Sequence, residues 1–346
     1  MYRILIVLFS ITCLNAQEPK SLGSLLYKEV TANVETEPVF AGDDAADDMC
    51  VLENFNNPES SLIISSDKKY GIIVYNLEGV KLYDYEVGRI NNVDILPSRS
   101  FQNKFIVAGT NRTYNSIDIY LFNSKGELEN LILRKEIPSL KDVYGVTFYR
   151  DEFNTYLFIS DKKGNVEQWS YNNDEVNSEI KFVRKLKFSS LVEGLVADES
   201  KGKIYIGQER KGIWELNAFP SFDSQKKLIF KKSKNFKPDF EGLALRDDGN
   251  GVGYLIASVQ GSNGYLIIDR KSLDAKIFFR IIDGDKIDGT TETDGIDVTS
   301  IKTSKFPNGF FIAQDDDNDG LNQNFKLVDW NKILKWKTLP LIIILS

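Results

Sequence analysis

Residues 63–75 read IISSDKKYGIIVY, in which a short apolar strand, a polar turn and a second apolar strand follow one another. The first strand ends in small and polar side chains, and the second carries an aromatic residue, Tyr75. Alternating apolar residues of this kind predict strands with one buried face. Related stretches recur five more times, as IVAGTNR at 106–112, FISDK at 158–162, YIGQE at 205–209, LIASVQ at 255–260 and FIAQD at 311–315.

The spacing of these copies indicates a repeat architecture. Their central residues are Ile64, Val107, Ile159, Ile206, Ile256 and Ile312, so successive copies lie 43 to 56 residues apart. Another related segment precedes each copy by 14 to 20 residues, which gives every unit at least three strands and room for a fourth. No helical period of useful length is present. We therefore predict an all-β fold, a six-bladed β-propeller with antiparallel blades of four to five strands.

The composition excludes several classes of enzyme and disfavours one class of partner. The 346 residues include 43 Lys and Arg against 50 Asp and Glu, a net charge of −7, and no histidine. The absence of histidine excludes Ser-His-Asp hydrolases, histidine phosphatases and the usual zinc hydrolases. The acidic balance disfavours nucleic acid as a partner and favours a metal or a cationic ligand.

The first residues have the pattern of an export signal. Residues 1–16 combine Arg3, an apolar run and the small residue Ala16, which predicts a secretory signal peptide cleaved after Ala16. The alternative is an apolar first strand of a cytosolic protein. We expect a soluble protein that is secreted or periplasmic.

The remaining chain divides by its pattern into three parts. We expect residues 17–34 to form an N-terminal segment, 35–334 the propeller and 335–346 an atypical C-terminal tail. The apolar run at 339–345 is far shorter than the roughly 20 residues that span a bilayer. No membrane span is therefore predicted.

Residues distant in sequence meet at one mouth of a propeller, because the innermost strands run along the central channel. The positions at the ends of the six repeated strands are Lys68, Arg112, Lys162, Glu209, Gln260 and Asp315. The preceding segments add Asp48, Asp94, Tyr144, Glu193, Glu241 and Asp297. We expect one side of the mouth to be cationic and the other to be rich in carboxylates.

A mouth of this kind suits a phosphate ester. Clustered carboxylates repel one another, and without histidine or cysteine they form a hard-oxygen set that favours Ca²⁺ or Mg²⁺. Lysine and arginine bind anions, and arginine offers a planar fork to phosphate oxygens. Metal on one wall and cations on the other predict a pocket for a polyanion. The alternative is a set of solvated loop charges that pair across blades.

Two acidic loops near the sixth repeat are further candidates for calcium. Residues 283–297 bring together several carboxylates and three glycines, and residues 315–320 read DDDNDG, the opening of a calcium loop. The full EF-hand pattern fails, because its twelfth position is Lys326 instead of glutamate. A charged surface turn is the alternative.

From about Glu35 to Ile333, the order and spacing of these motifs resemble the β-propeller phytases, also called Bacillus-type alkaline phytases. The matching stretches are DAADD at 44–48, DKKYGIIVYNLEG at 67–79, VGRINNVDI at 87–95, TNR at 110–112, VYG at 143–145, DKKGNVEQW at 161–169, VEGLVAD at 192–198, GIWELNA at 212–218, FEGLAL at 240–245, GYLIASVQG at 253–261, DGTTETDGIDV at 288–298 and QNFKLVDW at 323–330. The resemblance implies a six-bladed propeller that binds several Ca²⁺ ions and removes phosphate from the calcium salt of phytate.

The resemblance also implies roles for individual residues. The phosphate-binding groups are Lys68, Lys69, Arg112, Tyr144 and Lys162, among which Lys69 is auxiliary. The ligands of the catalytic calcium cluster are Glu193, Glu209, Asp239, Glu241 and Asp294. The ligands of structural calcium at blade junctions are Asp48, Asp288, Asp315 and Asp317. The catalytic set comprises Lys68, Arg112, Tyr144, Lys162, Glu193 and Glu241.

The chain departs from the family pattern at several positions. Residues 49–52 read MCVL where the family has PAIW, and Leu96 replaces an arginine. Gln208 and Lys163 stand where acidic residues are common, which lowers the negative charge around the metals. None of these changes removes a residue assigned to catalysis.

The leading hypothesis is calcium-dependent hydrolysis of phytate, or of another phosphate monoester, by a 3-phytase-type phosphatase that acts as a monomer. A metal-activated water would attack phosphorus in line while Lys68, Arg112 and Lys162 stabilise the equatorial oxygens. One alternative is a non-catalytic, calcium-stabilised propeller that serves as a binding module. Another is a lactonase or diesterase built on a six-bladed propeller.

Overall fold

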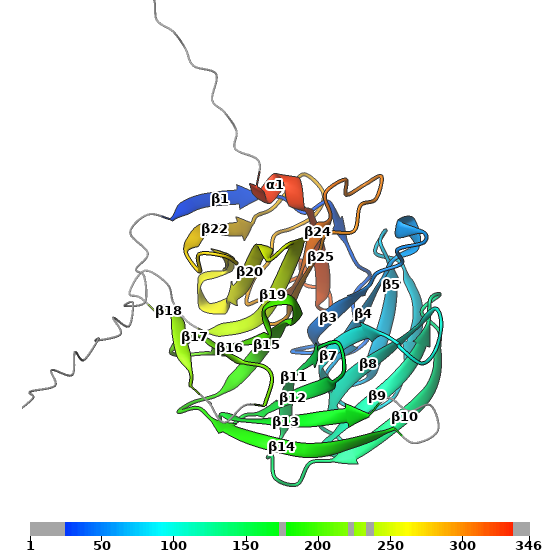
Figure 1. The fold of residues 1–346 in the computed structure, drawn as a ribbon. Coiled ribbons are helices and arrows are strands. Elements are labelled where there is room, and N and C mark those ends of the chain that lie inside the picture. The colour runs from blue at the N-terminus through cyan, green and yellow to red at the C-terminus, as the bar shows by residue number, and fades with distance from the viewer. Residues whose placement is uncertain (1–24, 173–177, 221–224, 233–238, 335–346) are drawn as a thin grey trace, which may run out of the picture.

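The computed structural model describes residues 25–172, 178–220, 225–232 and 239–334. Within these ranges, 25 strands form six sheets arranged in a ring (Figure 1), so the predicted six-bladed β-propeller is confirmed. The predicted signal peptide and C-terminal tail lie outside the described residues. None of the described helices is long and apolar enough to cross a membrane.

Four blades are antiparallel sheets whose strands follow one another in sequence from the axis outward. Blade I comprises β3 (Ala46–Leu52), β4 (Leu62–Asp67), β5 (Gly71–Asn76) and β6 (Lys81–Tyr85). Blade II comprises β7 (Ile90–Pro97), β8 (Lys104–Asn111), β9 (Ser116–Asn123) and β10 (Leu128–Glu136). Blade III comprises β11 (Val143–Arg150), β12 (Thr155–Asp161), β13 (Asn165–Asn172) and β14 (Glu179–Lys187). Blade IV comprises β15 (Val192–Asp198), β16 (Lys203–Gln208), β17 (Gly212–Asn217) and β18 (Lys227–Lys231).

The last two blades each take an outer strand from the N-terminal part of the chain. Blade V comprises β19 (Phe240–Gly249), β20 (Val252–Val259), β21 (Gly264–Asp269), β22 (Ala275–Ile281) and β1 (Leu26–Val30), which is parallel to β22. Blade VI comprises β23 (Ile296–Thr299), β24 (Phe310–Asp315), β25 (Asn324–Asp329) and the antiparallel β2 (Val34–Glu35). The two ends of the described chain are thus hydrogen-bonded into neighbouring blades, which closes the ring.

Short helical turns complete the fold. The 3₁₀ turns are η1 (Pro58–Ser60), η2 (Glu199–Lys201) and η3 (Gln260–Ser262), and α1 (Trp330–Leu334) follows β25. The α1 helix lies beside β1 (Figure 1), where Lys28 Nζ donates a hydrogen bond to the Ile333 carbonyl at 2.6 Å. This contact ties the end of blade VI to the outer strand of blade V.

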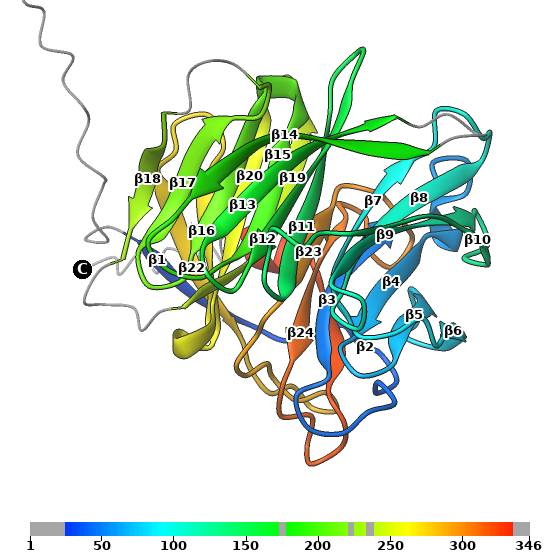
Figure 2. The ribbon, with the colours of Figure 1, turned by 90° about the horizontal axis from the view of Figure 1, so that it is seen from below.

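The hydrophobic core is divided into six clusters, each of which lies between two neighbouring blades. A central strand is therefore covered on both faces, and β5 is buried along almost its whole length. The prediction of strands with only one buried face is wrong for β5, because neighbouring sheets cover both of its surfaces. The outer strand β6 does alternate between half-buried and exposed residues. Figure 2 shows the outer strands β10 and β18 at the periphery.

Candidate active site

The innermost strands bulge where they reach one mouth of the channel. The pairing of β3 with β4 is interrupted between Ala46 and Met49, and β7, β11, β15 and β19 are interrupted at the equivalent place. A bulge adds a residue and redirects the side chains beside it. The first bulge residue of each blade, together with the residue that precedes β23 by two, forms a ring of six: Asp47, Asn91, Tyr144, Glu193, Glu241 and Asp294.

Glycine follows the ring residue in four of the six blades, because the backbones of neighbouring blades approach closely there. A Cβ atom placed on Gly145 would lie 1.9 Å from the Glu193 carbonyl oxygen, and one on Gly194 would lie 2.1 Å from that of Glu241. No side chain fits at such distances. The Tyr-Gly, Glu-Gly and Asp-Gly pairs of the sequence therefore mark the positions at which ring residues are held side by side.

A second set of residues lies on the turns that follow β4, β8 and β12. The side chain of Asp67 accepts a hydrogen bond from Lys69 N at 2.9 Å, and Asp161 accepts one from Lys163 N at the same distance. These contacts are Asx turns, which fix the backbone of the residue between donor and acceptor. The residues presented in this way are Lys68, Arg112 and Lys162.

Lys68 is held among carboxylates at the centre of the mouth. Its ammonium group lies 2.9 Å from Asp47 and 3.0 Å from Asp294, and it also contacts Asp44. Burial opposes the charged form of Lys68, but the charges of Asp47 and Asp294 outweigh it and raise the pKa of the lysine. The mouth thus keeps a buried positive charge beside its acidic groups.

Asn91 connects the cationic and acidic sides of the mouth. Its amide nitrogen donates to Asp47 Oδ2 at 2.6 Å and to Glu193 Oε1 at 3.1 Å. Its amide oxygen accepts a hydrogen bond from Arg112 Nη1 at 3.3 Å. One buried amide therefore orients a phosphate-binding candidate and two carboxylates.

Glu193, Glu209 and Glu241 form a compact carboxylate cluster, with one oxygen of each within 4.8 Å of the others. Burial and the charge of Asp294 raise the pKa of Glu193 to about 7, and burial and the charge of Asp239 raise that of Glu209 to about 7. Burial and the charge of Glu193 raise the pKa of Glu241 well above its usual range. The Glu241 Oε2 atom is buried and has no hydrogen-bond partner among the described residues. This set of buried, mutually repelling oxygens fits a hard divalent cation such as Ca²⁺.

Tyr144 and Lys162 lie beside the carboxylate cluster. The ammonium group of Lys162 stands 4.6 Å from the centre of the Tyr144 ring. Burial, followed by the charges of Glu193 and Asp47, raises the pKa of Tyr144, so its hydroxyl group remains a proton donor at neutral pH. Opposite them, Gln260 donates to Asp294 at 2.7 Å.

Lys69 and Asp239 stand at the edge of this arrangement. Lys69 Nζ donates to the Gly42 carbonyl at 2.5 Å and lies 3.7 Å from Asp43. Asp239 lies 4.0 Å from Arg210, and its charge is one that raises the pKa of Glu209. Both residues therefore border the central group.

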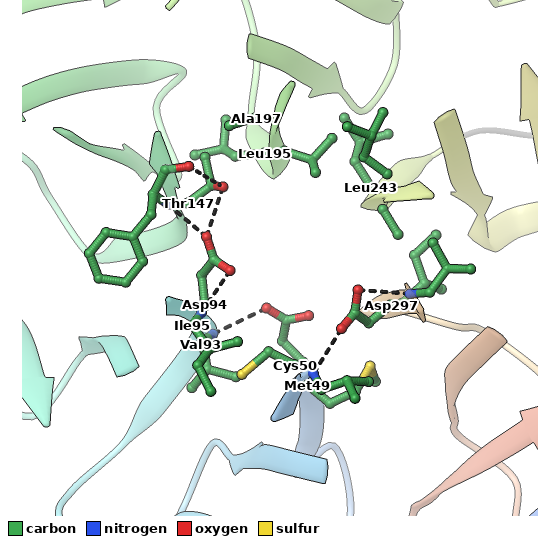
Figure 3. Close-up of a pocket in the computed structure, with 18 of the residues that line it drawn as sticks. Met49, Cys50, Val93, Asp94, Ile95, Thr147, Leu195, Ala197, Leu243 and Asp297 are labelled. Carbon is green, nitrogen blue, oxygen red and sulfur yellow. Dashed lines mark hydrogen bonds between the residues drawn. The ribbon is translucent and has the colours of Figure 1, made fainter. Parts of the chain in front are cut away.

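The prediction that Asp48, Asp94 and Asp297 face the mouth is wrong. Because the bulge places the neighbouring residue in the ring, Asp48 turns toward Asn92 and the Val93 amide, which each donate at 3.1 Å. Asp94 and Asp297 lie three residues after the ring residues Asn91 and Asp294, and they line an axial cavity of about 250 Å³ (Figure 3).

The deeper carboxylates tie neighbouring blades together. Asp94 accepts hydrogen bonds from Thr147 Oγ1 at 2.9 Å and Phe148 N at 2.6 Å, and Asp297 accepts one from Val51 N at 2.9 Å (Figure 3). Each bond joins one innermost strand to the next. Asp94 and Asp297 therefore have a structural role, because they hold neighbouring blades together.

Asp288, Asp315 and Asp317 lie around the loops of blade VI, where Asp315 ends β24. The buried ammonium group of Lys326 contacts Asp288 and lies 2.8 Å from Glu35 and 3.4 Å from Asp315. Asp317 is exposed and lines a separate cavity with Asp288. A lysine thus already supplies positive charge where the sequence predicted structural calcium.

The departures from the family pattern are accommodated by local contacts. Gln208 accepts a hydrogen bond from the Trp214 indole at 3.0 Å and donates to Ser189 and Ser190. Met49 and Cys50 are buried in the clusters on either side of blade I.

Sequence reasoning missed Asp47 and Asn91 as members of the ring. The signal was present in the repeats, since the pairs Asp47-Asp48 and Asn91-Asn92 occupy the places held by Tyr-Gly and Glu-Gly in later blades. The glycine marks the second position of the pair. Aligning the pairs on that glycine assigns the mouth to the first residue.

Comparisons with known proteins show the family of the chain. The Phytase family model matches residues 3–338. The 3-phytase of Bacillus subtilis is 38% identical over 322 residues, which cover 88% of this chain and 84% of that protein.

Two solved structures align with the chain at low sequence identity, and the first of them is similar in fold alone. The β-propeller domain of Myceliophteria thermophila Cps50 (Swd1) aligns with a TM-score of 0.51 at 12% identity, over 85% of this chain and 99% of that one. A functionally unknown protein from Desulfotomaculum acetoxidans aligns with a TM-score of 0.48 at 11% identity, over 69% and 73% of the two chains. The length and identity of the match to the Bacillus subtilis protein, together with the family model, show that the chain belongs to the phytase family, a family of phosphomonoester hydrolases.

Proposed function

We propose that the protein hydrolyses phytate, presented as its calcium salt, in a calcium-dependent reaction with metal-activated water. The observation that supports this most directly is the ring of six blade positions, in which Lys68 is linked through Asp47 and Asn91 to the cluster of Glu193, Glu209 and Glu241. The cations suit the phosphate oxygens, and the carboxylates suit a calcium ion.

The cationic residues bind and orient the phosphate group. Lys68, Arg112 and Lys162 donate to the phosphate oxygens and stabilise the charge that develops on them during in-line displacement. Tyr144 adds a hydroxyl donor, and Lys69 adds charge at the rim. Asn91 keeps the Arg112 guanidinium directed at the centre through its 3.3 Å contact.

The acidic residues would hold calcium. Glu193, Glu209 and Glu241 would be its ligands, with Asp239 and Asp294 beside them. Bound calcium supplies two effects, neutralisation of the polyanionic substrate and acidification of the attacking water. The same carboxylates exclude other anions from the mouth until the metal is bound.

Further features belong to this proposal. Asp48, Asp288, Asp315 and Asp317 would bind additional calcium ions that stabilise the propeller, and at Asp288 and Asp315 calcium would replace the Lys326 ammonium group. The chain would act as a monomer, with the catalytic domain at 35–334 and the outer strand β1 of its blade V supplied by the preceding N-terminal segment. It would be secreted to the outside or the periplasm after cleavage near Ala16.

A phytate assay tests the proposal. We expect the wild-type protein to release phosphate from phytate with added calcium and to release none in excess chelator. Lys68→Ala and Arg112→Ala should each lower kcat/KM by about 100-fold or more, since each removes a donor to the transition state. Lys125→Ala, at an exposed loop, is the matched control and should retain full activity.

The outcome separates the alternatives. Phosphate release that survives chelation would contradict the metal-dependent reaction. A calcium-dependent melting temperature without turnover of any phosphate ester would identify a binding module instead, and turnover of lactones or diesters in preference to monoesters would identify the third class.

A further inference from the structure

A group of exposed lysines extends from the mouth-side turns of blades III and IV to the outer strands of these blades. We call it the lysine track, and it consists of Lys163, Lys187, Lys211 and Lys226. The Lys187 ammonium donates to the Lys163 carbonyl at 2.7 Å, and the Lys226 ammonium donates to the Lys187 carbonyl at 2.5 Å. Since Lys226 precedes β18 and Lys187 ends β14, this second contact crosses the blade junction.

Two aromatic rings lie under the track and join its parts. Lys226 Nζ stands 4.7 Å from the centre of the Phe188 ring, and Lys211 Nζ stands 5.3 Å from that of Trp214. The two rings contact each other edge to face, with centroids 6.1 Å apart. Ammonium groups over aromatic faces are attracted to them, so the rings hold the lysine heads on one surface.

The charge of the track is not neutralised by neighbours. Within the described part of the chain, none of its four lysines forms an ion pair. Carboxylates of the same blades have other partners: Glu167 pairs with Lys185 at 3.1 Å, and Glu215 lies 4.0 Å from Lys227. Four uncompensated positive charges on a chain of net charge −7 make a local anion-attracting surface.

The track begins at the proposed active site. Lys163 directly follows Lys162, on the turn fixed by Asp161. Lys211 lies two residues after Glu209, a member of the carboxylate cluster. The inner end of the track, formed by Lys163 and Lys211, therefore adjoins the mouth.

We propose that the lysine track is a capture surface for polyphosphorylated anions, which binds them loosely and delivers them to the mouth. That the anion delivered is the substrate rests on the proposed function. Lysines are compact, strongly hydrated charges on flexible stems, which suits transient electrostatic holding better than fixed recognition. Steering of this kind raises the rate of encounter, so it acts on kcat/KM and weakens with salt.

Two measurements on one pair of variants test the capture surface. Lys187→Gln/Lys226→Gln removes half of the track and touches no residue of the mouth, and Lys125→Gln/Lys302→Gln makes the same charge change at exposed sites elsewhere. The first measurement is calorimetric titration of inorganic tripolyphosphate in excess chelator at low ionic strength. We expect the track variant to bind about tenfold more weakly than wild type and the control variant to bind within twofold.

The second measurement is phytate hydrolysis with calcium over a range of salt. The track variant should lose about fivefold in kcat/KM at low salt with kcat changed less than twofold, and its loss should vanish at high salt. Lys187→Arg/Lys226→Arg should restore wild-type behaviour, because the charge is restored.

The results distinguish failure of the capture surface from failure of the proposed function. Equal tripolyphosphate binding by the track variant, the control variant and wild type would overturn the capture surface, as would a loss of kcat/KM that persists at high salt. Weakened tripolyphosphate binding by the track variant in a protein that releases no phosphate would support the surface and refute the function.

Discussion

Replacing Glu193 with glutamine should stabilise the protein without calcium and destabilise it with calcium. Glu193 is buried in the three-carboxylate cluster, and its pKa is raised from 4.5 to about 7 by burial and the charge of Asp294. A carboxyl group with a raised folded-state pKa favours folding when it is protonated, and this contribution is lost as the pH rises through about 7. At pH 8.5 the wild-type protein therefore carries the full cost of an ionised Glu193.

The size of the effect follows from the shift. Each pKa unit corresponds to about 1.4 kcal/mol, so the shift to about 7 costs the wild type up to roughly 3 kcal/mol of folding free energy at pH 8.5. Glutamine keeps the shape and the acceptor for the Asn91 amide but carries no charge. The variant should melt on the order of 6 °C above wild type in chelator at pH 8.5, and the gap should close at pH 4.

The assay is thermal unfolding followed with and without calcium, at both pH values. With calcium the order should reverse, because the variant lacks a metal ligand while the wild type gains stability from binding. Glu167→Gln is the control, since Glu167 is equally buried but paired with Lys185, and its loss should lower stability by up to about 1 kcal/mol at pH 8.5. A Glu193→Gln protein that melts below wild type in chelator at pH 8.5 would refute the reasoning.

Three further predictions concern other parts of the fold. Lys326→Met leaves Glu35, Asp288 and Asp315 without their cation and should cost about 3–5 kcal/mol in chelator, with part of the loss recovered in calcium; an unchanged melting temperature would contradict this. Gly194→Ala places a Cβ 2.1 Å from the backbone of Glu241, so urea titration should show a loss of at least about 3 kcal/mol. Burial raises the pKa of Asp297 to about 7, so the wild type should lose up to roughly 4 kcal/mol of folding free energy in chelator as the pH rises from 4 to 8. Asp297→Asn should abolish this loss, and parallel pH profiles of the two proteins would argue against it.

The six-fold repeat was readable from the sequence because its cause is local. The strand and turn signals of residues 63–75 recur at regular steps, and the Asx turns that present Lys68 depend on an aspartate two residues before the donor amide. The register at the mouth was not readable from alternation alone, because a bulge shifts it by one residue and exchanges Asp48 for Asp47.

The blade VI loops show why charge patterns are harder to interpret than strand patterns. The acidic run at 315–320 predicted a cation, and the structure places the ammonium of Lys326 against Asp315, Asp288 and Glu35. Pairing between a strand and a loop from distant parts of the chain has no signature in local sequence. The lysine track was not predicted from the sequence for the same reason, since its four members become neighbours only where blades III and IV meet.

The most direct test of the central claim is a crystal structure of the protein with calcium and inorganic phosphate. We expect calcium bound by Glu193, Glu209 and Glu241, and phosphate within hydrogen-bond distance of Lys68, Arg112 and Lys162. Phosphate bound on another face, or a carboxylate cluster that stays free of metal at saturating calcium, would contradict the account.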